Sequence, residues 1–151
     1  MTPQHIEGLR ELDIALGELP KTVAKNTLVR VGKKRMQPTA EAMRAKATGG
    51  NDLRSSIAVS TKLSPRQAAL HRREIKSGAA EKQFAEVFTG AGPLPQAHLT
   101  EYGSVNNAPV GWGRSAWDET KGGVLPGIGA DLWDEIQKSA ARQAKRAARG
   151  K

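Results

Sequence analysis

The side chains that could carry chemistry in this chain are few, and the histidines come first. Among the 151 residues there are three histidines and no cysteine. His98 and Glu101 are three positions apart, the spacing with which one helix face offers two ligands to a metal ion, or a base and the carboxylate that orients it. A lone pair at this spacing is weak evidence for a site, and His5 and His71 lie in polar stretches. We therefore expect a helix-surface or interface contact at His98, with no metal site and no catalytic site.

Glycine-rich stretches can bind phosphate, but those of this chain lack the required context. A phosphate-binding loop needs glycines followed by Lys and Ser or Thr at the start of a helix. The segment "TGAGPLP" at 89–95 has prolines where free N–H groups are needed, and "GIG" at 127–129 has no such neighbours. Without cysteine, a thiolate zinc site and a cysteine nucleophile are also excluded. We expect a protein that is not an enzyme and that uses no cofactor.

Composition and charge narrow the class of protein further. The length is that of one domain, and only 38% of the residues are hydrophobic and 4% aromatic. The formal net charge is +9, with an isoelectric point near 10.2, which favours nucleic acid, acidic protein surfaces or anionic membrane as partners. No apolar run approaches the ~20 residues of a membrane span, and "MTPQHIEGLREL" lacks the layout of a signal peptide. We expect a soluble protein made in the cytoplasm, with no membrane partner.

Hydrophobic periodicity predicts two helices in the first third of the chain. Apolar residues at spacings of three and four predict a short amphipathic helix over 6–19 that ends before Pro20. A second apolar stripe predicts a long helix over 21–47 whose other faces are strongly basic. Pro38 should kink this helix or divide it in two, because its ring removes a hydrogen bond and clashes with the preceding turn.

The middle of the chain is typical of a small antiparallel sheet. The turn "TGGND" precedes a candidate strand over 53–63, and "QFAEVFTG" at 83–90 is the second candidate, with Phe84 and Phe88 on one face. The segment 64–82 between them is polar, basic and long for a loop. We expect it to be an arm that orders on assembly, unless residues 66–76 form a short helix.

A short helix and a loop follow the predicted sheet. Residues 95–102 begin with a proline and are followed by Gly103, which is typical of a helix with a glycine at its end. The segment 104–113 is expected to be a loop, and "RSAWDETK" at 114–121 one or two helical turns.

The last part of the chain predicts one more helix and a basic tail. After Gly122 and Gly123, apolar spacing predicts a helix over 125–136. The expected fold class is α+β, with long N-terminal helices, a small antiparallel β-sheet or hairpin, a short helix and a C-terminal helix. We expect a single α+β domain over 1–136 and a basic, flexible tail over 137–151.

Basic side chains gather on the long helix and in the tail. The candidates for contact with DNA or with an acidic partner are Lys33, Lys34, Arg35, Arg142, Lys145 and Arg146. Neither region contains an aromatic residue, so stacking on single strands is not expected. Attraction to the phosphate backbone remains, as does docking on an acidic protein surface.

The aromatic residues are concentrated in one stretch. Two of the three Trp and the only Tyr of the chain lie within "AHLTEYGSVNNAPVGWGRSAWDETK" at 97–121. Three sequence elements, one upstream of this stretch and two within it, occur in a recognisable order along the chain. The first contains Gly50, Leu53, Ser56 and Ile57; the second contains His98, Glu101, Tyr102, Gly103 and Ser104; the third contains Arg114, Ala116, Trp117 and Asp118.

This order resembles a family of bacteriophage neck or tail components, whose type member is gene product ten of a lambdoid long-tailed phage. The resemblance covers about residues 8–136. Ser115 replaces the proline usual in the third element, and "Gly-Trp" at 111–112 replaces the usual "Pro-Phe". The resemblance implies a virion structural protein without catalytic residues. It also implies a ring in the neck, or at the head-proximal end of the tail, that joins tail to head and completes the tail.

A ring subunit needs surface anchors, and interfaces concentrate Trp, Tyr and Arg. The candidates for the subunit interface are Glu101, Tyr102, Trp112, Arg114 and Trp117. Trp112, between two glycines, is the better candidate of the two Trp, whereas Trp117 and Tyr102 could equally complete a core short of aromatics.

Several partners follow from the resemblance. They are other copies of the chain in a ring, six-fold by analogy with tail tubes or twelve-fold beside a connector, and neighbouring connector, head-closure, tail-terminator and tail-tube proteins. Basic residues lining the lumen could contact genomic DNA without reading its sequence. The alternative function is a non-specific nucleic-acid-binding protein that uses the basic helix and the tail.

Overall fold

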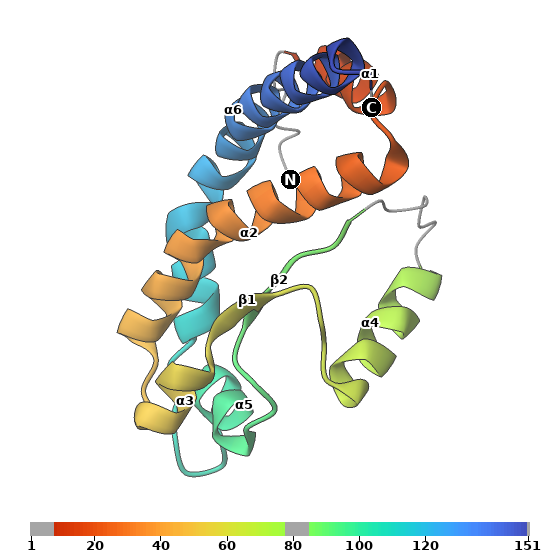
Figure 1. Cartoon of the computed structure of the whole chain (residues 1–151). Coiled ribbons are helices and arrows are strands. Elements are labelled where there is room, and N and C mark those ends of the chain that lie inside the picture. Colours follow the sequence, from red (N-terminus) through yellow and green to blue (C-terminus); the bar gives the residue numbers. More distant parts are fainter. Residues whose placement is uncertain (1–7, 78–84, 151) are drawn as a thin grey trace.

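The computed structural model describes residues 8–77 and 85–150. Its helices are α1 (Leu9–Gly17), α2 (Lys21–Lys46), α3 (Asn51–Ser56), α4 (Pro65–Ser77), α5 (Pro95–Tyr102) and α6 (Trp112–Ala148). The strands are β1 (Ala58–Ser60) and β2 (Phe88–Gly90). The chain is therefore α+β as expected, mostly helical, with one small antiparallel sheet (Figure 1).

The two long helices α2 and α6 run antiparallel and form the frame of the molecule (Figure 1). Polar contacts join them along much of their length. In the first half of α2, Arg30 forms an ion pair with Glu135, and in its second half the Thr39 and Thr120 hydroxyls are 2.8 Å apart. Arg30 and Arg35 of α2 thus meet acidic residues of α6 that lie 105 and 96 positions away in sequence.

Two groups of buried apolar side chains lie along this frame. One contains Leu12, Leu19, Ala24, Val31, Leu132 and Ile136, and joins α1 to α2 and α6. The other contains Ala40, Met43, Ala47, Leu53, Ile57, Trp112 and Ala116. This second group ties α3, the sheet and the start of α6 to the end of α2. Apolar burial thus holds both ends of the α2–α6 pair.

Helix α6 is longer than the sequence predicts. We expected a turn over 114–121, a break at Gly122 and Gly123, and a new helix from 125, but α6 is continuous from Trp112 to Ala148 and also contains Pro126. The buried side chains Ala116, Val124 and Leu132 lie on both sides of the glycines and the proline. Their packing against α2 offsets the roughly 1 kcal/mol that each helical glycine costs.

The basic end of the chain is helical through Ala148, and every side chain over 140–150 is exposed. Ser139 is the last buried residue of α6. The division into a domain over 1–136 and a separate tail over 137–151 stays a prediction.

Helix α2 passes through Pro38 without a break, so of the two expected outcomes, a kink or a division into two helices, the division is wrong. The ring of Pro38 is on the exposed side of the helix. Its neighbour Thr39 is buried and bonded to α6, and Arg35, one turn earlier, is also bonded to α6. Contacts on both sides of Pro38 thus compensate for the hydrogen bond that proline cannot make. The shorter helix expected before Pro20 is confirmed as α1.

The sheet pairs Ala58 with Gly90 and Ser60 with Phe88 in antiparallel register. The first strand was expected over 53–63, but residues 51–56 form α3 and only three residues form β1. Leu53 and Ile57 are fully buried against the end of α2, and the Arg44 guanidinium donates two hydrogen bonds to the Ile57 carbonyl, at 3.0 and 2.7 Å. These tertiary contacts override the β propensity of the segment. In the second predicted strand, 85–87 is irregular and Phe84 lies outside the described residues.

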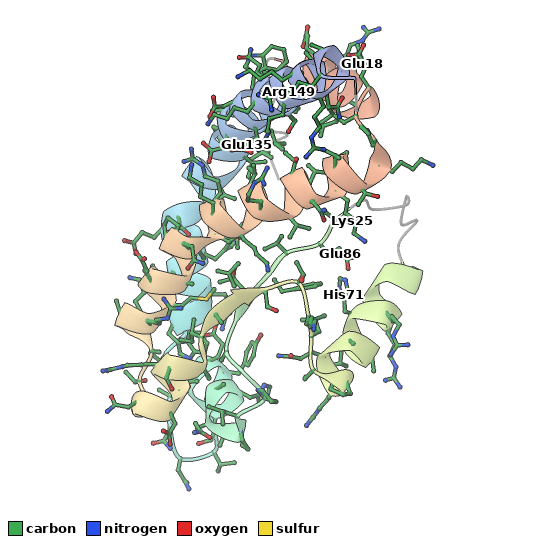
Figure 2. The ribbon with its side chains drawn as sticks, viewed as in Figure 1. Glu18, Lys25, His71, Glu86, Glu135 and Arg149 are labelled. Atoms are coloured by element: carbon green, nitrogen blue, oxygen red, sulfur yellow. The ribbon has the colours of Figure 1, made fainter. Side chains whose placement is uncertain are left out.

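The segment after β1 forms helix α4, which confirms the helical alternative for 66–76. Figure 1 shows α4 standing apart from the α2–α6 pair, on the side of the small sheet. Its best-defined link to the rest of the subunit is His71. The His71 Nε2 atom lies 3.1 Å from Glu86 Oε1, and the ring meets Phe88 edge-on with centroids 5.2 Å apart. Figure 2 shows His71 and Glu86 pointing toward each other.

None of the helices over 8–77 and 85–150 has the length and apolar character that crossing a bilayer demands.

Candidate subunit interface

The aromatic stretch forms a corner in which α5, a tight loop and the start of α6 meet. Helix α5 ends at Gly103, whose φ of 85° is a left-handed value that L side chains rarely adopt. A Cβ at this position would lie 2.9 Å from the Pro109 nitrogen. The Val110 and Gly111 N–H groups donate to the Thr100 and Glu101 carbonyls, at 2.9 and 3.2 Å. Gly103 is therefore required for the chain to reverse and bring α6 against α5.

Glu101 is buried inside this corner and stabilises the start of α6. One carboxylate oxygen accepts a hydrogen bond from the Gly113 N–H at 2.7 Å, and the other from the Arg114 N–H at 3.1 Å. These are first-turn N–H groups that lack partners within the helix. The carboxylate also lies at the positive end of the helix dipole. Glu101 was predicted at a subunit interface, but its partners here belong to its own subunit.

Trp112 lies in the core, with an exposed fraction of 5%. It packs with Leu53, Ile57 and Ala116, and its indole N–H donates to the Thr100 hydroxyl at 3.1 Å. The flanking glycines suggested an exposed loop, but Trp112 is the first residue of α6 and faces inward. We therefore do not retain Trp112 as an interface candidate.

The exposed members of the predicted set lie on the outside of the corner. The Arg114 guanidinium lies over the Tyr102 ring, 5.6 Å from its centroid. The His98 ring, one turn earlier on α5, lies against the same Tyr102 ring, with the two ring centroids 4.9 Å apart. Trp117, one turn beyond Arg114, has an exposed fraction of 42%. These contacts hold Tyr102 and Arg114 in fixed positions, as a binding surface requires.

Several apolar side chains that the sequence analysis did not select extend this exposed area. With Tyr102 and Trp117 they make up the corner surface: Leu99, Tyr102, Val105, Val110 and Trp117, all exposed. Val105 is fully exposed at the tip of the loop. Their sequence signal was weak, because isolated valines and leucines in a loop are usually unremarkable. Only the fold shows that they belong to one corner.

The six basic candidates are placed unequally. Arg35 donates two hydrogen bonds of 2.7 Å to Asp131, Lys34 lies 3.2 Å from the same carboxylate, and Arg142 lies 3.9 Å from Glu135. The Arg35 hydrogen bonds and, to a smaller extent, the Lys34 ammonium lower the pKa of Asp131 to about 2. Lys34 and Arg35 therefore serve partly to join α2 to α6, whereas the Arg142 contact lies within α6.

The other three, Lys33, Lys145 and Arg146, form no ion pair among the residues that the structure describes. A groove of about 240 Å³ separates the start of α2 from the end of α6, and Arg30, Arg142 and Arg146 contribute to its walls. Donors that could meet an anion are thus gathered on this side of the subunit.

A metal site is not formed from the residues within the described ranges, since no three His, Asp or Glu side chains gather there closely enough. The carboxylate of Glu101 faces the α6 backbone and the ring of His98 lies against Tyr102. His5 is outside the described residues.

The residues of the first sequence element have structural roles. Leu53 and Ile57 are core residues. The Ser56 hydroxyl donates to the Leu53 carbonyl at 2.7 Å and accepts from the Gly92 N–H at 3.3 Å. Ser56 therefore ties α3 to the segment that leaves β2 and enters α5. Together with Gly103 and Glu101, these residues build the corner from inside.

The subunit thus combines a frame of two long helices with a small sheet and a corner rich in aromatic residues, and its sequence matches a known protein family. Residues 10–103 match the family described as "Bacteriophage HK97-gp10, putative tail-component". This match covers more than half of the chain and includes the first sequence element and the second as far as Gly103. The chain belongs to this family of phage tail components, which places it in the virion as a structural protein of the tail. Comparisons with curated proteins and with solved structures gave no match.

Proposed function

We propose that this tail component forms a ring at the neck, or head-proximal end of the tail, that joins the tail to the head and completes the tail. The observation that carries the proposal is the corner surface beside a rigid helix junction. An exposed Tyr, Trp and Arg with a rim of Leu and Val have the composition of an interface core rather than of ordinary surface. We expect a homo-oligomer of six subunits, with twelve as the alternative.

Two rings of different proteins would flank this one, a connector or head-closure protein on one side and a tail-terminator or tail-tube protein on the other. A structural role of this kind calls for no catalytic residue. Lys33, Lys145 and Arg146 would then either line a lumen near DNA or dock on an acidic neighbouring ring.

The first experiment is light scattering on the purified protein over a range of concentrations, at low and moderate salt, with and without DNA. We expect a discrete oligomer that persists at moderate salt and does not need DNA, because apolar contacts are not screened by ions. A chain that remains monomeric at every concentration would contradict a self-assembling ring.

The corner surface can be tested with a matched pair of tryptophans. Trp117→Ala and Trp133→Ala both remove an indole from α6, and the exposed fractions of the two side chains, 42% and 45%, are nearly equal. We expect Trp117→Ala to weaken assembly while Trp133→Ala does not, with similar unfolding midpoints for the two variants, because each loses a similar share of buried apolar surface. Equal effects would show that the corner surface is not the contact.

Non-specific nucleic-acid binding is the second candidate function, and the arginine-lined groove between α2 and α6 favours it. It predicts that the isolated chain binds double-stranded DNA with an affinity that falls steeply as salt rises. Replacing Lys145 and Arg146 by Gln should then lower the affinity and the salt dependence together. If Trp117→Ala abolishes assembly and leaves DNA binding intact, the two activities are separate.

A further inference from the structure

Helix α1 presents an exposed apolar residue between two acidic ones. Leu12 and Leu19 point into the core, whereas Ile14 has an exposed fraction of 59%. Glu11, three residues before Ile14, and Glu18, four residues after it, are exposed and lie on the same face as Ile14 by helical spacing. Arg10, four residues before Ile14, is also exposed and lies on this face by the same spacing, so the face carries two glutamates and one arginine. The outer face of α1 is thus an isoleucine flanked by glutamates.

Helix α4 presents the complementary pattern. Leu70 has an exposed fraction of 52%, and the exposed Arg66 and Arg73 lie four residues before it and three residues after it. His71, the next residue of the helix, points in a different direction, toward Glu86 and Phe88. Figure 2 shows His71 on the side of α4 that faces the sheet. As far as the structure describes the side chains of α4, its outer face thus carries a leucine flanked by two arginines.

The spacings match when the two helices are antiparallel. With Ile14 against Leu70, Glu11 faces Arg73 three residues, or about 4.5 Å, from the centre on one side. Glu18 faces Arg66 four residues, or about 6 Å, from the centre on the other side. In a parallel arrangement, Glu11 would face Arg66 and Glu18 would face Arg73. One partner of each pair would then be three residues from the centre and the other four, so the charges would be out of step. Among the ion pairs between side chains that the structure describes, which leave out those of 74–84, none uses these glutamates or arginines.

We propose that α4 of one subunit docks antiparallel on α1 of the next copy of the chain. This inference rests on the proposed ring and names one of its contacts. Figure 1 shows α1 beside the end of α6 and α4 at a separate place on the subunit. A contact between two different patches is heterologous, and repetition of it closes a ring when the rotation between subunits allows.

The expected strength of the contact decides what it does. Exposed ion pairs are individually weak and are screened by salt, and a single helix pair buries less surface than a stable interface needs. The α1–α4 contact therefore selects the neighbour and its orientation, while the corner surface contributes further apolar burial. Opposite charges at matched positions favour this arrangement over like-charged contacts of α1 with α1 or α4 with α4.

The absence of cysteine makes the contact directly testable by cross-linking. Ile14→Cys and Leu70→Cys proteins, purified separately with tags of different mass, are mixed and oxidised. Each protein carries one thiol, so a disulfide-linked dimer that contains both tags joins an Ile14→Cys chain to a Leu70→Cys chain. The control mixture contains Ile14→Cys and Leu125→Cys, since Leu125 is an exposed apolar residue of α6. We expect the Ile14–Leu70 mixture to yield several-fold more mixed dimer than the control.

Charge reversal then tests the register. Glu11→Arg with Glu18→Arg in the Ile14→Cys protein should reduce the mixed dimer to the control level. Adding Arg66→Glu with Arg73→Glu to the Leu70→Cys protein should restore it, because the attraction is re-created with opposite signs. All these positions are on the surface, so circular dichroism should show unchanged helix content.

Failure of this inference is distinguishable from failure of the proposed ring. If the unmodified chain forms a discrete oligomer but the Ile14–Leu70 mixture does not exceed the control, the docking is wrong and the ring remains. If reversal on both sides fails to restore a cross-link that reversal on one side removed, the register is wrong. If the chain is monomeric by light scattering and no mixed dimer forms, both the docking and the self-assembling ring are overturned.

Discussion

Replacing Glu101 by Gln should destabilise the subunit through the start of α6. The carboxylate accepts two backbone hydrogen bonds, from Gly113 and Arg114, in a buried position. Hydrogen bonds to charged groups contribute roughly 1.5–3 kcal/mol each. A Gln side chain can keep one of them through its oxygen, but its NH2 group faces the other N–H as a second donor. The favourable charge at the helix N-terminus, worth about 0.3–1 kcal/mol, is lost as well.

The expected loss is therefore about 2–3 kcal/mol in the free energy of unfolding. For a domain of this size, each kcal/mol corresponds to roughly 2–4 °C in Tm. The assay is urea unfolding followed by circular dichroism, in which the midpoint should fall while the slope stays constant, because the surface exposed on unfolding is unchanged.

Glu119→Gln is the matched control on the same helix. Glu119 forms an ion pair with Lys46 at 3.0 Å, but its side chain is 62% exposed, and exposed ion pairs contribute at most about 1 kcal/mol. We expect its unfolding midpoint to stay close to that of the unmodified protein. If Glu101→Gln and Glu119→Gln unfold at the same urea concentration, the capping role assigned to Glu101 is refuted.

Three further predictions concern the frame and the corner. Because contact with Arg35 lowers the pKa of Asp131 from 3.8 to about 2 in the folded chain, this carboxylate contributes about 2 kcal/mol of stability above pH 4. That contribution should be lost as the pH falls toward 2. The free energy of unfolding of Asp131→Asn should therefore depend less on pH in this interval than that of the unmodified protein. An unchanged pH dependence would show that the ion pair is not coupled to folding. Gly103→Ala should lower Tm, because Gly103 has a left-handed φ and a Cβ there would contact Pro109. Gly122 is in an open helical position, so Gly122→Ala should raise the free energy of unfolding by up to about 1 kcal/mol. Equal shifts of the two variants in differential scanning calorimetry would contradict this. Trp112→Phe should cost about 1–3 kcal/mol by leaving the Thr100 hydroxyl without its indole donor in the core, and light scattering should show assembly unchanged wherever the variant is folded.

The sequence predicted much of the fold because many of its signals are local. The bounds of α5 follow from a proline at its start and Gly103 after its end, and α1 follows from the spacing of its leucines. The family resemblance rests on residues such as Leu53 and Ile57, whose pattern survives even though the segment is helical where a strand was expected. Local sequence patterns were sufficient to predict the structure of segments that are determined by residues close to them in the sequence.

Elsewhere the tertiary structure decided. Gly122, Gly123 and Pro126 are helix breakers by propensity, yet α6 continues through them because α2 packs along its length and joins it through Thr39 and Arg35.

The candidate interface was also sorted by the fold. Glu101, Trp112 and Tyr102 lie close together in sequence, and all three were selected from the sequence as interface candidates. The turn at Gly103 directs the first two inward and leaves Tyr102 exposed. Residue types and order determined the family and the helices; burial and the pairing of distant side chains determined which of those residues remain free to meet a partner.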